Sequence, residues 1–157
     1  MKLNGKKIET AIEIVVIPRS TGDLVFKAKA ISAYDDFNKL CPTPVPPTIK
    51  RPGQPESQDT TDPAFKKAMD LWASAHTNWM IIESLKATEG LEWETVIPND
   101  PGTWGNFQNE LESSGLAQNE IIRIVNIVLD ANGLNDKKIE AATKAFLAST
   151  AATPAGQ

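Results

Sequence analysis

The side chains with the greatest catalytic potential in this chain are one histidine, His76, and one cysteine, Cys41. A nucleophilic pair needs the thiol and the imidazole within hydrogen-bond reach, with a third group to orient the imidazole. No motif surrounds either residue, and Trp72 and Met80 lie one helical turn before and after the histidine. A packed histidine is therefore the favoured interpretation, with a Cys–His pair as the minor alternative. A histidine-rich metal site is excluded.

Carboxylates are more numerous. The candidates are an aspartate pair and three glutamates near a tryptophan: Asp35, Asp36, Glu89, Glu92 and Glu94. General acid–base work by paired carboxylates needs an apolar pocket that separates their pKa values. Helix-start positions and a solvated strand face are the favoured interpretations. The segment "NDPGTWGNF" has neither the glycine spacing nor the preceding strand of a phosphate-binding loop. We expect no catalytic, cofactor-binding or metal-binding residue, and predict that the protein is not an enzyme.

Four tryptophans in the middle third of the chain are the more promising binding residues: Trp72, Trp79, Trp93 and Trp104. The first two are a heptad apart on a helical segment that also carries two methionines, a combination that suits a groove for a partner's apolar segment. Core packing is the favoured interpretation for Trp72 and Trp79. For Trp93 and Trp104, on short or connecting segments, core packing and partner binding are almost equally favoured. All four are candidate partner-binding residues.

The elements that position these side chains begin with a β-hairpin over residues 8–32. Apolar residues alternate in "IETAIEIVVIP" and "DLVFKAKAIS", and "RSTGD" supplies the turn, with Gly22 available for a positive φ. Glutamates on the first strand and lysines on the second are expected to pair across an exposed face. Because an isolated hairpin is marginal in water, it must pack on more strands or on the helices that follow.

A proline-rich segment separates the hairpin from the helical part. A two-turn helix is predicted over residues 33–40, with Ser32 as N-cap, and residues 41–63 then hold seven of the eleven prolines. P-x-x-P spacing occurs at Pro44 to Pro47 and at Pro52 to Pro55, which leaves a polyproline ligand as an alternative. An extended strap between the two halves of one module is the favoured interpretation.

Helical periodicity dominates the remainder. A long helix is predicted from an Asp62 N-cap and Pro63 to about Ala87. Residues 91–96 are a short strand or a connector. Further helices are predicted from Asp100 to Gly115, over "NEIIRIVNIVLDANG", and from Asn135. The apolar residues that these three helices are expected to bury are Trp104, Phe107, Leu111, Ile121, Ile124, Val125, Val128, Leu129, Ile139, Ala142 and Phe146.

The predicted fold class is α+β: an N-terminal β-hairpin or small antiparallel sheet, a proline-rich strap, then a C-terminal bundle of about four helices. The expected boundaries are 1–40 for the hairpin and short helix, 41–62 for the strap, 63–148 for the helical domain and 149–157 for a flexible tail.

Composition narrows the function classes. The net charge is −4 and lysines are spread thinly, so nucleic-acid binding is not expected. No apolar run approaches the roughly 20 residues that span a bilayer. One cysteine excludes an internal disulfide and favours a reducing compartment. A soluble cytoplasmic protein is expected.

The order of these elements resembles that of the tail assembly chaperones encoded in tailed-phage structural modules. The segments that carry the resemblance are "EIVVIPRSTGDLVFKAKAIS", "YDDFNKLCPTPVPP", "WASAHTNWMIIESLKATEGLEWETV", "DPGTWGNFQNELESSGL" and "NEIIRIVNIVLDANGLND". The resemblance covers nearly the whole chain and includes no catalytic motif.

The resemblance implies a non-enzymatic helper in the cytoplasm of an infected bacterium. Such a chaperone binds the tape measure protein, whose long apolar helices otherwise aggregate, and helps recruit tail tube subunits; self-association is also expected. The alternative is a structural virion protein of the tail or connector, such as a tail-tube, tail-completion or minor tail protein.

Overall fold

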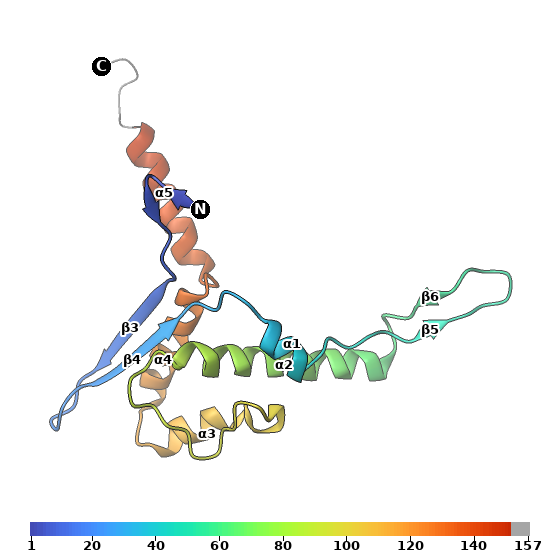
Figure 1. The fold of residues 1–157 in the computed structure, drawn as a ribbon, viewed down its shortest axis with the longest axis horizontal. Coiled ribbons are helices and arrows are strands. Elements are labelled where there is room, and N and C mark those ends of the chain that lie inside the picture. Colours follow the sequence, from blue (N-terminus) through green and yellow to red (C-terminus); the bar gives the residue numbers. More distant parts are fainter. Residues whose placement is uncertain (152–157) are drawn as a thin grey trace. The chain divides into compact units, whose positions relative to one another are not determined.

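The structure is a computed structural model that describes residues 1–151. It has an α+β fold in which small antiparallel two-stranded sheets precede the longer helices (Figure 1), which confirms the predicted fold class. The strands pair as β1 (Lys2–Leu3) with β2 (Lys6–Lys7), β3 (Ile12–Ile17) with β4 (Leu24–Lys29), and β5 (Thr48–Ile49) with β6 (Ser57–Gln58). The helices are α1 (Asp35–Leu40), α2 (Pro63–Leu85), the 3₁₀ helix η1 (Pro101–Thr103), α3 (Asn106–Ser113), α4 (Gln118–Ala131) and α5 (Asp136–Ala151).

The chain forms two compact units and passes between them more than once. Unit 1 contains residues 1–30, residues 84–89 and the chain from residue 119 onward, and unit 2 contains residues 31–83 and 90–118. The units are therefore assembled from segments distant in sequence.

The main hairpin of unit 1, β3–β4, confirms the predicted strand–turn–strand. Its register places Ile12 opposite Lys29 and Ile17 opposite Leu24. Gly22 has φ 125°, as the turn requires, and its N–H donates to the Arg19 carbonyl over 3.2 Å.

The predicted faces of this hairpin are wrong. Glu13 lies opposite Ala28, whereas Lys27 lies opposite Ile14, so the glutamate and the lysine project from opposite faces and cannot pair across the sheet. The face that carries Ile14 is exposed, and the opposite face holds the buried Ala28 and Ile17. The covered face of the hairpin is therefore the one that carries Glu13, because tertiary packing decides which face is covered.

The hairpin β1–β2 was not predicted. Its turn is Asn4–Gly5, with φ 51° and 78°, which is the Asn-Gly signature of a tight hairpin turn. The Asn4–Gly5 dipeptide is therefore the sequence signal from which this hairpin could have been predicted.

Helices α4 and α5 complete the described part of unit 1. Helix α4 buries Ile121, Ile124 and Val128, as predicted, and also Ile127. It ends before Gly133, whose φ of 69° confirms the predicted stop.

Helix α5 buries none of its described residues, so the prediction that it buries Ile139, Ala142 and Phe146 is wrong. The helix also continues to Ala151, through the first residues of the predicted flexible tail, and the rest of that tail lies outside the described residues.

In unit 2, the short helix α1 forms where predicted but begins later. Its N-cap is Tyr34, without a side-chain cap, in place of the expected Ser32. The proline-rich segment that follows is not extended throughout, because β5 and β6 pair within it across a turn that contains Gly53 at φ 77°.

Helix α2 begins as predicted, with the Asp62 carboxylate accepting the Phe65 N–H over 2.8 Å. The segment over residues 91–96 forms no strand and runs as a connector. η1 and α3 follow, and Phe107 and Leu111 of α3 are buried as predicted. Trp104, for which core packing and partner binding were almost equally favoured, is also buried.

Candidate functional site

An aromatic cluster in unit 2 surrounds His76. The Tyr34 ring stacks on the imidazole with centroids 4.7 Å apart, and Phe37 meets it edge-on at 5.0 Å. Trp72 lies at 5.4 Å. Figure 1 shows α1 alongside α2, and this pairing brings Tyr34 and Phe37 from α1 and its cap against the rings of α2. The imidazole therefore has packing partners, as its position between Trp72 and Met80 indicated.

Phe37 is the centre of this cluster. Its side chain is completely buried, and its ring lies 5.6 to 5.9 Å from those of Trp72, Trp79 and Trp104. Rings at these separations are each worth about 0.5–1.5 kcal/mol beyond the area they bury. Three of the four candidate tryptophans thus converge on one phenylalanine of the short helix.

The tryptophans differ in what they leave accessible. Trp104 and Trp79 are 0% and 5% exposed, whereas Trp72 and Trp93 are half-buried. The Trp72 indole N–H donates to the Cys41 carbonyl over 3.2 Å, which holds the start of the proline-rich segment against α2. Core packing is confirmed for Trp79. Only Trp72 and Trp93 have surface to offer a partner without rearrangement of the fold.

The structure does not assemble a Cys–His relay. Within residues 1–151, His76 makes ring contacts but no hydrogen bond to Cys41 or to a carboxylate. Burial raises the pKa of the Cys41 thiol, so the nucleophilic thiolate is disfavoured. In the same residues, no group of three or more His, Cys, Asp or Glu side chains is arranged to hold a metal ion, and no buried side-chain nitrogen or oxygen lacks a partner.

The carboxylates occupy structural positions. Asp35 and Asp36 are exposed in the first turn of α1, as predicted for helix-start residues. Glu89 pairs with Lys27 over 2.9 Å, and the hydrogen bond from that lysine lowers the pKa of the glutamate.

Glu110 of α3 is a polar anchor that no pattern in the sequence indicates. Its carboxylate accepts the N–H groups of Glu94, Thr95 and Val96 over 2.9, 2.6 and 3.1 Å, and also the Thr95 hydroxyl. Burial alone would raise the pKa of Glu110, but these hydrogen bonds outweigh it and hold the pKa below the usual value. One carboxylate thereby fixes the connector around Trp93.

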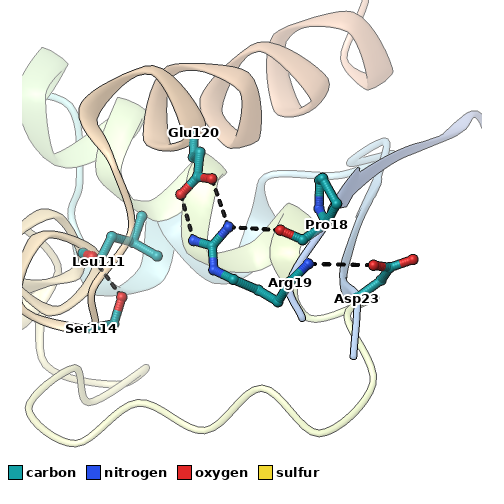
Figure 2. Close-up of polar contacts among 6 residues, drawn as sticks. All are labelled: Pro18, Arg19, Asp23, Leu111, Ser114 and Glu120. Atoms are coloured by element: carbon teal, nitrogen blue, oxygen red, sulfur yellow. Dashed lines mark hydrogen bonds and ion pairs between the residues drawn. The ribbon is translucent and has the colours of Figure 1, made fainter. Parts of the chain in front are cut away.

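Two further polar contacts help to fix the β3–β4 hairpin within unit 1, besides the Lys27–Glu89 pair and a 3.5 Å ion pair between Glu13 and Lys138. The Arg19 guanidinium donates to both carboxylate oxygens of Glu120 over 2.7 and 2.6 Å (Figure 2). The Thr88 hydroxyl accepts the Lys27 N–H and donates to the Lys27 carbonyl, both over 2.9 Å. The first contact joins the hairpin turn to α4, and the second joins β4 to the turn after α2.

Among the places in unit 1 where large apolar side chains remain exposed, α5 and β3 each present several of them on one face. On α5, Ile139, Phe146 and Leu147 are 49%, 64% and 58% exposed, and their spacing puts them on one face of the helix. On β3, Ile12 and Ile14 are 53% and 54% exposed. Contiguous exposed apolar residues mark interaction surfaces, so these two faces join the half-buried tryptophans as candidate binding sites. The apolar periodicity of α5 and of β3 is visible in the sequence, but the exposure of these two faces is not.

None of the helices within residues 1–151 is long and apolar enough to cross a membrane. Comparison of the chain with protein-family models, with curated proteins and with solved structures gave no match.

Proposed function

We propose that this protein is a non-enzymatic tail assembly chaperone of a tailed phage, which binds the tape measure protein and helps recruit tail tube subunits in the host cytoplasm. The family assignment rests on the order of elements and on the sequence segments that resemble such chaperones. In the structure, the observation that carries the proposal is the apolar face of α5, which has Ile139, Phe146 and Leu147 exposed on one side.

This face suits the apolar helices of a tape measure protein. A helix with one uncovered apolar stripe can pack against the stripe of another helix, and both then remove apolar surface from water. Lys138 and Lys144 lie on either side of this face along the helix. The whole chain has a net charge of −4. Such a surface keeps the chaperone soluble between binding events.

Co-expression with the tape measure protein encoded nearby tests the proposal. We expect Phe146→Ser with Leu147→Ser to lower the amount of soluble tape measure protein, with little effect on the stability of the chaperone, because both residues are exposed. Leu71→Ser is the matched control: Leu71 is 64% exposed on α2, outside the proposed face, so its removal should change nothing.

The possible outcomes separate the surface from the function. If the double variant supports the tape measure protein as well as the wild type does, α5 is not the binding face. If omission of the whole protein leaves the tape measure protein soluble, the chaperone proposal itself fails. Trp93→Ala tests the remaining tryptophan hypothesis; Trp104→Ala does not, because Trp104 is completely buried and its loss would damage the fold.

A structural virion protein is the second candidate, and the exposed β3–β4 hairpin favours it, since a hairpin can join a sheet between subunits. Mass spectrometry of purified mature particles separates the two candidates. A chaperone should be absent from the particles, whereas a structural component should be present at a fixed copy number.

A further inference from the structure

The outer edge of β3 is open. The Ala30 N–H donates to the Ala11 carbonyl over 2.9 Å, which identifies that opposed pair as a hydrogen-bonded one. Such pairs alternate along an antiparallel ladder, so Ile12, Ile14 and Val16 belong to the intervening pairs and direct their N–H and C=O groups away from β4. Within residues 1–151, these outward groups have no hydrogen-bond partner.

The side chains at this edge are also uncovered. Ile12, Ile14 and Val16 are 53%, 54% and 51% exposed, and Val25, opposite Val16, is 43% exposed. Natural sheets usually protect an open edge with lysine, proline or a bulge. Here all three outward positions are β-branched and apolar, which favours pairing over protection.

The opposite edge of the hairpin is blocked at its middle position. Lys27 is an outward position of β4, and the Thr88 hydroxyl takes up both its N–H and its C=O over 2.9 Å. Figure 1 shows β4 on the side of the turn that follows α2, with β3 on the far side of the hairpin. A hairpin that is blocked on one side can pair through its other side only, which gives a closed pair rather than an endless sheet.

We propose that β3 pairs antiparallel with β3 of a second copy of this chain, on a two-fold axis at Ile14. In this register Ile14 lies opposite its own counterpart, and Ile12 lies opposite Val16, so every outward group of the three residues gains a partner. A shift by two residues leaves one of them unpaired. Glu13 falls opposite Val15, so no like charges face each other.

The ends of the edge support this register. Pro18 is the next outward position after Val16; it has no N–H, and its carbonyl accepts the Arg19 Nη1 over 3.0 Å (Figure 2). The pairing segment therefore stops at Val16, and β3 itself begins at Ile12, so the segment is centred on Ile14. An identical strand in this register pairs every outward group of both copies and sets only apolar residues opposite one another at these three positions, which is the reason for choosing a second copy as the occupant over a foreign strand.

The association should be weak, because an edge pairing of this length buries less area than a standard interface. We expect a dissociation constant of roughly 10–100 μM. Sedimentation equilibrium of the full chain, from about 5 μM to about 1 mM, should show the mass rising from 17.1 kDa towards that of a dimer and no further. The inference does not depend on the proposed chaperone function.

Proline substitutions test the edge specifically. Ile14→Pro removes an N–H that points away from β4, so it spares the internal ladder and should raise the dissociation constant roughly tenfold or more. Lys29→Pro is the matched control, because Lys29 is also an outward position but on β4; it should leave the constant unchanged. If Ile14→Pro fails to fold by circular dichroism, Ile14→Lys replaces it and sets like charges against each other on the axis.

Hydrogen exchange supplies an independent readout. The amides of Ile12, Ile14 and Val16 should exchange quickly at low concentration and slowly at high concentration. A monomer at every concentration, growth beyond a dimer, or a dimer unaffected by the Ile14 variants overturns the proposal. It is also overturned if the edge is protected only when a different protein is bound.

Discussion

At the scale of single residues, two side chains organise much of unit 2, one by ring packing and one by hydrogen bonds. Phe37 organises the rings of Trp72, Trp79 and Trp104, and Glu110 organises the connector at residues 94–96. Neither residue was selected from the sequence, since the partners of each come from other segments of the chain.

The contrast between Phe37 and Phe146 gives a matched prediction. Phe37→Ala should lower the free energy of unfolding by about 3–5 kcal/mol, because the ring is completely buried. Phe146→Ala should change it by less than about 0.5 kcal/mol, because that ring is 64% exposed. Urea denaturation of both variants measures the difference. Equal effects would mean that Phe37 is not buried or that α5 is covered.

Glu110 predicts a pH-dependent contribution to stability. Its folded-state pKa is lowered from 4.5, so its stabilisation is complete above that value and is lost as the pH falls through the lower folded-state pKa. Glu110→Gln should cost about 1–2 kcal/mol at pH 7, and the gap to wild type should narrow below pH 4.5. Urea denaturation at several pH values measures this.

A matched control lies on the same helix. Glu112 is exposed and, within residues 1–151, accepts only from Gln108, so Glu112→Gln should change the free energy of unfolding little at pH 7. A constant gap between wild type and Glu110→Gln from pH 7 to pH 3 would contradict the hydrogen-bond explanation.

At the scale of elements, the β3–β4 hairpin is stable because unit 1 fastens it, as its marginal stability in isolation required. The turn is fastened through the paired Arg19–Glu120 contact, and β4 through Thr88. Neither of these contacts uses the outward backbone groups of β3, so β3 is the strand left with an open edge.

Arg19→Lys tests the fastening of the turn. A lysine cannot reproduce the two parallel hydrogen bonds to Glu120, so the amides of residues 18–23 should exchange faster and Tm should fall by about 1–3 °C. Arg123→Lys, at an exposed position of α4, is the control and should alter neither quantity. Unchanged exchange in the turn of Arg19→Lys would show that the ion pair does not hold it.

At the scale of the whole molecule, the proposed chaperone function and the proposed self-pairing use different exposed surfaces. A chaperone keeps the α5 face free until its client arrives, and the self-pairing edge of β3 is a separate surface from that face. Particle composition, co-expression and sedimentation therefore test three independent statements about one chain.

The sequence by itself determined where most elements begin and end. Asp62 with Pro63, Gly22 in the turn and Gly133 after α4 act through the local backbone, so their effects are readable without the fold. The same holds for Asn4–Gly5, a signal that was present although no hairpin was predicted there.

Only the tertiary structure decided which faces are covered. The alternation of β3 is satisfied equally well with either face inward, and the apolar stripe of α5 is compatible with a core or with a partner. Burial depends on what packs against an element from elsewhere in the chain, so Ile14 and Phe146, expected on covered faces, are exposed, while Phe37 and Trp104 are completely buried. That difference moved the candidate binding surface from the tryptophans to α5 and the edge of β3.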